Sequence, residues 1–545
     1  MTDTTVNPPR PAVIVGAGPC GLAAACALMR LGVPVRVLES ATERGRGARS
    51  SQLWPPALEV LDRIGVLAEA RRRGVRIKAN EYHIAGGRRI RIELGAENEP
   101  LILPQEQTTE LLEDALERLG GRVERATEVI SVDAGPDVVI VKARGPDGPK
   151  LIEADWLIGA DGVHSLVREQ LGIDFEGEPV PMIMLVSEGR VTGRYDRGCV
   201  HSFLGRTGSL MFVPMPGDIV RVAGAVPRDT PLTRDAVQKI VDDRGPGGLL
   251  LAEPELITTF GSQERVAAEF RRGRCFLVGD AAHTHAPVGG QGLNLGLQDV
   301  HNLAWKLAGV IHGRLRPEIL DTYDTERRQA AEQIIRTTHQ LVWILTRGPI
   351  AARVRNTAAE ALQAAGVLRR RFIPLLAGWR ISYPDILLGS QPAGAPRSLQ
   401  RPVSRALPRP GVRTPHWVPV PEPGTGDLFR LLTIGTPADG LAHWGEAIAG
   451  RLPDLLSHDH LPRRGTGFLL LRPDGYVAAR GKSADDLDRL ERTLADHLVS
   501  PQMTEKSLYA LFVDDRRPTI HYFVDTLTRC GKSGESDPCC SPSRR

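Results

Sequence analysis

A cluster of glycines near the start of the chain has the spacing that can hold a pyrophosphate. Gly16, Gly18 and Gly21 form a G-x-G-x-x-G pattern between the apolar run 12–15 and a helical pattern. Such glycines let the backbone approach a pyrophosphate, which the positive end of the following helix stabilises. Glu39 follows a second apolar run and can accept hydrogen bonds from a ribose. The spacing therefore predicts a dinucleotide site.

A second glycine-rich loop begins where a later strand ends, at Gly279 and Asp280. The loop and the helix start that follows it contain Pro287, Gly289, Gly290, Gln291, Gly292, Leu293 and Asn294. Because its amides open a long helix, they form a second place where negative charge is stabilised. Two such places in one chain predict a ligand longer than a single phosphate.

Two histidines in this loop, His283 and His285, raise the question of a metal. Their spacing does not place them on one face of a helix, and no third ligand lies nearby in the sequence. We therefore interpret both as structural residues. The seven cysteines are scattered and lack zinc-type or disulfide-framework spacing, so we expect reduced thiols and no metal site.

The elements that must position these loops form a discontinuous nucleotide domain. Apolar runs at 12–15 and 35–38 flank a helix and predict a βαβ unit. Runs at 156–159 and 275–278 end at or beside Gly and Asp, as parallel strands do before ligand loops. Between these two runs, hairpin patterns predict an antiparallel insert that binds the substrate.

Length and local composition suggest further divisions of the chain. The 545 residues correspond to about three or four domains. A helical pattern follows the second loop, and a segment rich in Pro and Arg separates it from a small α/β domain. The expected parts are a nucleotide domain of 1–178 and 271–391, a substrate domain of 179–270, a linker of 392–426, a third domain of 427–500, and a tail of 501–545 with a disordered end.

The numbers of basic and acidic residues indicate which classes of partner are not expected. The chain has 69 basic and 65 acidic residues, a net charge of +4, so no nucleic-acid partner and no membrane partner is expected. It has no apolar run of about 18 residues and no targeting pattern at its start, which predicts a cytoplasmic protein. The oligomeric state stays open.

Three segments together resemble the signature motifs of a known family. These are the turn 16–21, the segment 155–168 that contains Asp161, and the loop 279–294. They resemble the motifs of the single-component FAD-dependent aromatic hydroxylases, flavoprotein monooxygenases typified by p-hydroxybenzoate hydroxylase. The segment 299–306 resembles a helix of this family, and the segment 471–480 resembles the thioredoxin-like third domain of its polyketide-tailoring branch. The resemblance covers roughly residues 10–500.

The resemblance implies an α/β fold class. A Rossmann-like FAD/NAD(P)-binding domain would carry an inserted antiparallel β-sheet substrate domain and a thioredoxin-like C-terminal domain. No cysteine lies between Cys275 and Cys530, so the third domain has no CxxC motif and cannot perform dithiol chemistry. We expect its role to be structural.

The resemblance also implies FAD as the cofactor. The residues expected at its ADP half are Gly16, Gly18, Cys20, Gly21, Glu39, Ser40 and Arg49. Others expected to bind FAD are Gln105 (or Gln107) on the flavin side, Val129 on the adenine side, Asp161, and Asp280 near the ribityl or phosphate region. The backbone from Gly290 to Asn294 would face the isoalloxazine and stabilise charge on the reduced ring.

The expected catalytic positions are Pro287, Gly289 and Gly290. Two residues depart from the family pattern: Pro56 stands where relatives commonly have Arg, and Ala286 stands where Pro or Ser is usual.

The implied activity is that of an NAD(P)H-dependent monooxygenase in natural-product biosynthesis. A flavin C4a-hydroperoxide would hydroxylate a bulky, polycyclic polyketide-type substrate, and Baeyer–Villiger oxidation is an alternative on the same fold. A second alternative is a non-redox cyclase that holds FAD and shapes a polyene for cycloaddition. The sequence does not choose between NADH and NADPH.

Overall fold

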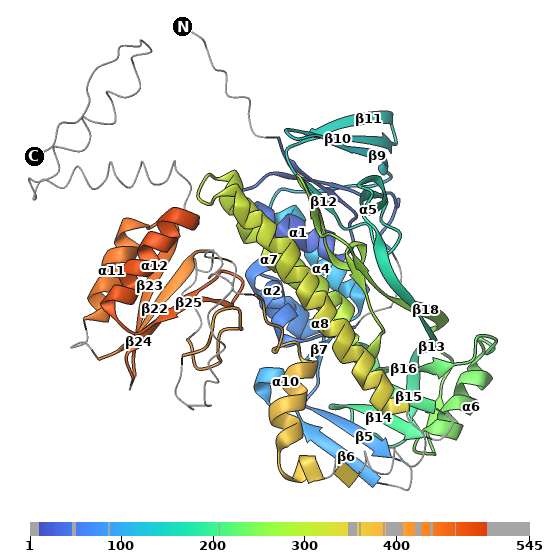
Figure 1. Ribbon diagram of the computed structural model, residues 1–545. Helices are drawn as coiled ribbons and strands as arrows, with labels where there is room; N and C mark the ends of the chain where they lie inside the picture. Colours follow the sequence, from blue (N-terminus) through green and yellow to red (C-terminus); the bar gives the residue numbers. More distant parts are fainter. Residues whose placement is uncertain are drawn as a thin grey trace, which may run out of the picture.

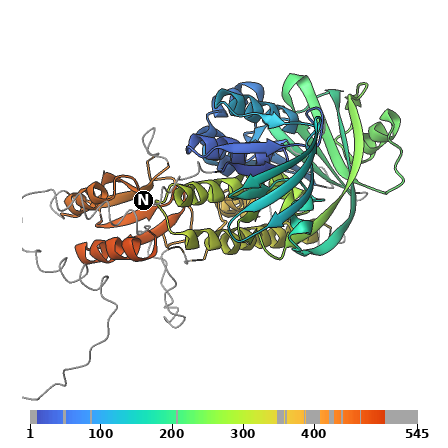
Figure 2. The same cartoon turned by 90° about the horizontal axis from the view of Figure 1, so that it is seen from above.

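The computed structural model describes residues 10–45, 51–84, 88–205, 208–346, 357–358, 361–384, 387, 407–419, 427–436, 440–463 and 465–498 (Figure 1). The predicted site residue Arg49, much of the expected linker and the tail 501–545 lie outside the described residues. Figures 1 and 2 show a small C-terminal α/β unit at one side of the long helices and a large curved sheet at the other.

A six-stranded sheet, ordered β19-β20-β12-β1-β2-β8, forms the nucleotide-binding part. Strand β1 (Ala12–Val15) pairs in parallel with β2 (Val35–Leu38) and with β12 (Leu157–Gly159), and β12 pairs in parallel with β20 (Cys275–Leu277). Helix α1 (Pro19–Arg30) connects β1 to β2. All four residues of β1 are buried, as expected for a central strand of a parallel sheet. The predicted βαβ unit is confirmed.

Two long helices follow the second glycine-rich loop. Helix α7 (Gln291–Ile311) buries apolar residues at spacings of three and four, including Leu297, Val300 and Leu307, so its predicted helical pattern is confirmed. It packs against α1, and α8 (Asp321–Thr346) packs against α7. Helix α7 is therefore held in the core, with its first residues beside the glycine-rich loop.

Shorter elements complete this part of the molecule. The helices are α2 (Pro55–Ile64), α3 (Leu67–Arg73), α4 (Gln105–Arg118), α5 (Leu166–Gln170) and α10 (Ile373–Leu376). The strands are β3 (Gln52–Leu53), β4 (Val75–Arg76), β7 (Leu101–Ile102), β8 (Val123–Glu124), β9 (Glu128–Ala134), β10 (Val139–Gly145), β11 (Gly148–Ala154) and β19 (Arg271–Arg272). Strands β9 to β11 form a separate antiparallel sheet.

A nine-stranded sheet contains the predicted substrate insert. Its strands are β5 (Ala79–Ile84), β6 (Arg88–Glu93), β13 (Phe175–Thr192), β14 (Cys199–Gly205), β15 (Gly208–Pro214), β16 (Ile219–Val226), β17 (Leu250–Leu251), β18 (Leu256–Ala267) and β21 (His283–Thr284). The predicted hairpin is confirmed, since β15 and β16 pair antiparallel. Helix α6 (Arg234–Arg244) packs its Val237 and Val241 into an apolar cluster on one side of this sheet.

The nine-stranded sheet extends beyond the expected segment 179–270. Strands β5 and β6 come from the region expected in the nucleotide domain, and β5 pairs in parallel with β14. A parallel pair cannot be joined by a tight hairpin. The chain that connects these two strands passes through β6, through part of the nucleotide domain and through β13, and local patterns do not reveal this connection.

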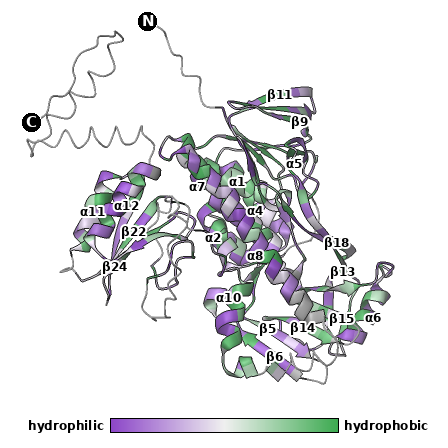
Figure 3. Ribbon diagram, viewed as in Figure 1, coloured by the Kyte–Doolittle hydropathy of each residue, from purple (hydrophilic) through white to green (hydrophobic). Residues whose placement is uncertain are grey.

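The C-terminal unit is a four-stranded sheet ordered β23-β22-β24-β25. Its elements are β22 (Phe429–Gly435), α11 (Leu441–Arg451), β23 (Leu456–Pro462), β24 (Gly467–Leu471), β25 (Val477–Gly481) and α12 (Ala484–His497). Strands β24 and β25 pair antiparallel as a hairpin. Figure 3 shows hydrophilic and hydrophobic residues alternating along α11 and α12, as expected for helices with one face on a sheet.

A buried set of charged residues docks the C-terminal unit onto the two long helices. This docking cluster consists of Asn302, Lys306, Glu326, Arg472 and Asp474. Glu326 on α8 accepts hydrogen bonds from Arg472 at 2.6 and 2.8 Å, from Lys306 at 2.7 Å and from Asn302 at 2.7 Å. Arg472 also donates to Asp474 at 2.6 and 2.9 Å. Each charge is buried with a partner, as buried charges require.

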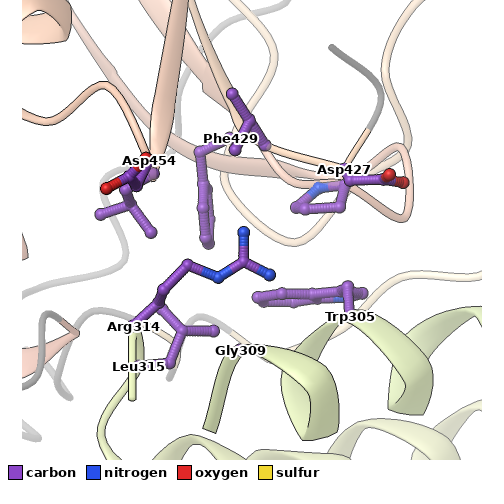
Figure 4. Close-up of a pocket in the computed structure, with 10 residues that line it drawn as sticks. Trp305, Gly309, Arg314, Leu315, Asp427, Phe429 and Asp454 are labelled. Carbon is purple, nitrogen blue, oxygen red and sulfur yellow. The ribbon is translucent and has the colours of Figure 1, made fainter. Parts of the chain in front are cut away.

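A crevice lies beside the docking cluster, between the end of α7 and the C-terminal unit (Figure 4). Trp305 and Arg314 line it from the helical side, and Asp427, Phe429 and Asp454 line it from the other. Its volume of about 10 Å³ is room for one water molecule at most. This crevice is therefore too small to be a substrate pocket.

Among the described helices, none has the length and apolar character needed to cross a membrane.

Candidate active site

The first glycine turn packs tightly on one side and is open on the other. A Cβ at Gly16, where φ is +102°, would lie 2.4 Å from the carbonyl oxygen of Ala160, and a Cβ at Gly21 would lie 2.0 Å from that of Gly16. A Cβ at Gly18 would meet nothing within 4 Å. Gly18 also begins α1 without a side-chain cap, which leaves amide donors at the helix start. The turn therefore fits a pyrophosphate.

Glu39 lies at the end of β2, beside this turn. Its carboxylate accepts hydrogen bonds from the backbone N–H of Ala17 at 2.7 Å and of Ala41 at 2.9 Å. Ser40, which is exposed, donates its hydroxyl to the same carboxylate at 3.3 Å. Glu39 is thus held in a fixed orientation, and its remaining lone pairs are available to hydroxyl groups of a ligand.

The predicted adenine side lies along the same edge. The N–H of Thr127 donates to the carbonyl of Glu39 at 2.8 Å, so the approach to β9 runs beside the end of β2. Val129 lies two residues further on and is buried. Gln105 is the first residue of α4, where it is half-buried, and Gln107 lies in the same first turn.

Asp161 supports the first turn from within the protein. One of its carboxylate oxygens accepts a hydrogen bond from the Ser165 hydroxyl at 2.5 Å, and the other accepts from the N–H of Val167 at 3.0 Å. Burial raises the pKa of Asp161. A Cβ at Gly16 would lie 3.1 Å from the Cα of Asp161. These contacts orient the start of α5 and place the Asp161 backbone against the glycine turn.

Cys20 and Asp280 lie where the two glycine-rich segments meet. A Cβ at Gly279 or at Gly296 would lie 2.8 or 2.5 Å from the Cys20 sulfur, so this thiol fills the narrow gap between α1 and α7. Burial raises the pKa of Cys20 well above its usual value, and the negative charges of Asp280 and Asp299 raise it further. The thiol stays protonated, whereas Asp280 is exposed at the strand end.

The second loop approaches α7 through two left-handed glycines. Gly289 has φ +76° and Gly290 has φ +63°, and Pro287 precedes them. Gly290 precedes the first residue of α7 and supplies no side-chain cap, so the amides of the helix start are available to a ligand. Gly292 lies beside the His285 ring, and Leu293 is buried in the first turn.

The Asn294 side chain fastens this loop to β3. Its amide group donates to the carbonyl of Gln52 at 2.8 Å and to that of Gly290 at 2.6 Å, and its oxygen accepts from the N–H of Trp54 at 2.6 Å. The Trp54 indole N–H donates to the carbonyl of Gly289 at 2.9 Å. Side chains therefore hold both left-handed glycines through hydrogen bonds to their carbonyl groups. The side-chain amide and oxygen of Asn294 both form hydrogen bonds to the protein backbone.

His283 belongs to a hydrogen-bond network beneath Asp280. Its Nε2 lies 2.7 Å from Asp299, which also accepts from the N–H of Gly279 at 3.0 Å and from Arg327 at 2.7 Å. Burial alone would raise the pKa of Asp299, but His283 and Arg327 lower it. The contacts agree with the structural interpretation of His283.

The nine-stranded sheet reaches this site through β16. Arg221 donates to the Ser51 hydroxyl at 2.9 Å and to Glu188 at 2.7 Å. Ser51 directly precedes Gln52, which contacts the second loop through Asn294. The loop and the sheet of the expected substrate domain therefore meet at this point.

A comparison with protein families decides the nature of the site. The model of the FAD binding domain family matches residues 10–338, more than half of the chain. The chain belongs to this family. The resemblance predicted from the three motifs is confirmed, and FAD is the cofactor of this flavoprotein.

Relatives of the flavoprotein extend over nearly its whole length. The 6-methylpretetramide 4-monooxygenase of Streptomyces rimosus is 29% identical over 528 residues, covering 89% of this chain and 93% of that protein. The dialkyldecalin synthase of Streptomyces rugosporus is 32% identical over 496 residues, covering 88% and 96%. The solved structure of anhydrotetracycline hydroxylase from Streptomyces rimosus matches with a TM-score of 0.70 at 28% identity, covering 89% and 98%.

Sequence reasoning missed the residues that hold the flavoprotein's loop in place. Trp54 contacts the loop, Asp299 contacts the strand end, and Arg327 donates to Asp299. All three lie outside every glycine pattern. Of the two departures from the family pattern, Pro56 lies in the first turn of α2 and Ala286 is buried within the loop. Only the position of Asp299 inside the similar segment 299–306 could have drawn attention to it.

Proposed function

We propose that this flavoprotein is an NAD(P)H-dependent monooxygenase that inserts one oxygen atom into a bulky, polycyclic aromatic polyketide. The observation that carries this proposal is the helix start at Gly290, whose uncapped amides lie at the junction between the cofactor domain and the nine-stranded sheet. The other support comes from relatives whose names describe oxygenation of tetracycline-type compounds.

The first turn and its surroundings would hold the ADP half of FAD. The amides after Gly18 would stabilise the pyrophosphate, and Glu39 would accept hydrogen bonds from the ribose. Ser40 and Arg49 are proposed on the same side, with Val129 toward the adenine. Asp280 would lie near the ribityl or phosphate region, where its exposed carboxylate can accept hydroxyl hydrogen bonds.

The second loop would hold the flavin ring. When bound there, reduced FAD would supply the two electrons that activate molecular oxygen, so that one oxygen atom would enter the substrate and the other would leave as water. The amides that follow Gly290 would stabilise negative charge on the reduced ring. Asn294 and Trp54 would keep the loop from moving, and Pro287, Gly289 and Gly290 would shape the space where the substrate approaches the ring.

The C-terminal unit is proposed to be a thioredoxin-like domain with a structural role. It lacks cysteine, so it cannot take part in dithiol exchange. Its attachment through the docking cluster buries charge on the side of α7 and α8, away from the nine-stranded sheet (Figure 2). We propose that it stabilises the two helices on which the flavin loop depends.

A second candidate function is a non-redox cyclase that holds FAD while it shapes a polyene. The dialkyldecalin synthase relative favours it, because that protein is named for making a fused carbocycle and matches nearly the whole chain. Such a reaction needs pocket shape rather than additional catalytic groups. Baeyer–Villiger oxidation is a third outcome that the same oxygen chemistry allows.

Anaerobic mixing of the FAD-loaded protein with NADH or NADPH tests the proposal. Flavin bleaching should be rapid and should be accelerated by polycyclic phenols but not by single-ring acids. After ¹⁸O₂ is admitted, the product should contain one ¹⁸O atom. The label should be in a phenol if the reaction is a hydroxylation, or in a lactone if it is a Baeyer–Villiger oxidation. Unstimulated, slow bleaching together with cyclisation of a polyene without NADPH would support the cyclase instead.

A further inference from the structure

A cluster of metal-ligand residues lies in the nine-stranded sheet, outside the flavin site. Glu81 and His83 lie on β5, and His201 lies directly opposite Glu81 on the parallel strand β14. All three side chains are largely buried or half-buried. Among the residues that the structure describes, they form a three-residue group with the chemistry and proximity of a metal site.

The ligand atoms converge on one point. His83 Nε2 lies 3.1 Å from His201 Nδ1 and 3.2 Å from a carboxylate oxygen of Glu81, and that oxygen lies 3.9 Å from His201 Nδ1. Two ligands of a tetrahedral ion with bonds of about 2.0 to 2.1 Å are separated by about 3.3 to 3.5 Å. The three separations bracket this value, so one ion could bind all three atoms with small side-chain adjustments.

The surroundings orient both imidazole rings. His201 Nε2 lies 2.8 Å from the carbonyl oxygen of Asp196, which accepts a hydrogen bond only if Nε2 carries the proton. Its Nδ1 lone pair then points at His83 Nε2, within hydrogen-bonding distance, and a bound ion would take the place of that contact. Metal-bound histidines commonly have this arrangement, in which the other ring nitrogen donates to a carbonyl. The His83 ring stacks on Phe203 at a centroid distance of 4.3 Å, which fixes its plane.

Neither of the nearby arginines pairs closely with Glu81. Arg91 lies 3.5 Å from Glu81 but donates at 2.7 Å to Glu93 and at 2.8 Å to Asp196. Arg89 approaches Glu81 only at 4.0 Å and is largely exposed. If a metal ion binds beside Glu81, it can neutralise the carboxylate without either arginine.

We propose that Glu81, His83 and His201 bind one divalent transition-metal ion of the zinc class, with water as the fourth ligand. Two imidazoles and one carboxylate are the ligands such an ion favours. The inference does not rest on the proposed oxygenase activity, since the cluster lies apart from the flavin motifs.

A bound ion would join β5 to β14, two strands far apart in the sequence. The opposite faces of these strands carry Tyr82 and Val200, which pack in one apolar cluster with Ile373 of α10. The ion would therefore make the part of the nine-stranded sheet that faces α10 more rigid. We expect metal binding to raise thermal stability without changing the FAD content.

The test uses full-length, FAD-loaded protein in which Cys530, Cys539 and Cys540 are replaced by Ser, because thiols of the tail also bind zinc. Chelator-treated protein is titrated with ZnCl₂ in competition with a chromophoric chelator, and separately with CoCl₂ to record the visible bands of tetrahedral cobalt. The variants are His83→Ala, His201→Ala and the near-isosteric Glu81→Gln. His443→Ala, an exposed histidine on α11, is the matched control.

We expect one zinc per chain, with affinity reduced by more than about tenfold in each cluster variant and unchanged in His443→Ala. The FAD content of every variant reports that it is folded. Equal zinc affinity in the parent and the cluster variants, or no zinc uptake by the parent protein, would overturn the proposal. If the alanine variants do not fold, Glu81→Gln alone decides, because unchanged affinity in that variant also overturns it.

Discussion

The two ends of helix α7 use polar groups in opposite ways. At its start, Gly290 provides no side-chain cap for the backbone donors of the helix. The side chain of Asn294 forms hydrogen bonds that hold the loop and does not cap those donors. About three and four turns later, Asn302 and Lys306 are buried in the docking cluster, where every charge has a partner within the protein. Backbone donors without a side-chain cap are found at the end proposed to hold the cofactor, and charges paired within the protein are found toward the other end.

This difference predicts how the two ends respond to substitution. Changes in the docking cluster should lower the stability of the whole protein because they leave buried charges unpaired. Changes at the proposed cofactor site should mainly lower FAD affinity, because the backbone donors at the start of α7 have no side-chain cap. The expected effects follow from the largest to the smallest.

The largest effect is expected for Glu326→Ala. The substitution leaves Lys306 and Arg472 buried without their shared carboxylate, which should reduce stability by about 3 to 5 kcal/mol. Thermal unfolding followed by circular dichroism measures it. Glu332→Ala, at an exposed position of the same helix, is the control and should change stability by less than about 0.5 kcal/mol. Equal melting temperatures for the two variants would show that the cluster does not dock the domain.

A pH effect of the order of 3 kcal/mol is expected at the same residue. Burial alone would raise the pKa of Glu326, but Arg472 and Lys306 lower it from 4.5 to about 2. The stability contributed by the charged form is therefore fully present above about pH 4.5 and is lost as the pH falls toward 2. Urea unfolding at several pH values should show a steeper loss for the wild type than for Glu326→Gln. Parallel curves would contradict this pKa.

At the other part of the proposed cofactor site, the end of β2, Glu39→Ala should weaken FAD binding by about 1.5 to 3 kcal/mol through the loss of a charge-assisted hydrogen bond. This corresponds to a dissociation constant about 10- to 150-fold higher, measured by fluorescence titration of the apoprotein. Glu117→Ala, exposed on α4, should bind FAD like the wild type. Because Glu39 also accepts hydrogen bonds from Ala17 and Ala41, the melting temperature of the apoprotein must be compared as well.

The features that the sequence predicts are those encoded in neighbouring residues. The βαβ unit, the hairpin of β15 and β16, and the helical pattern of α7 each lie within a short stretch with its own turn residues, and each is confirmed. The glycine loops could be found for the same reason. Their predicted roles in FAD binding follow from spacing and from the family resemblance, and remain predictions residue by residue.

The features that the sequence does not predict depend on contacts between distant segments. Asn294 meets Gln52 across 242 positions, Arg472 meets Glu326 across 146, and His83 meets His201 across 118. No periodicity encodes such pairs, because each partner satisfies its own local pattern. The membership of β5 and β6 in the nine-stranded sheet is hidden in the same way, since β5 pairs with a strand more than a hundred residues later.

The FAD content of Gly290→Val tests most directly the claim that the start of α7 faces the flavin. Gly290 has φ +63° and an added Cβ would lie 3.2 Å from that of Gln52, so valine should cost about 1 to 3 kcal/mol. Gly120→Val, at φ +82° with open space around it, imposes similar strain away from the loop. The account predicts lowered FAD occupancy and a shifted flavin spectrum in Gly290→Val only. Full occupancy and an unshifted spectrum in Gly290→Val would contradict it.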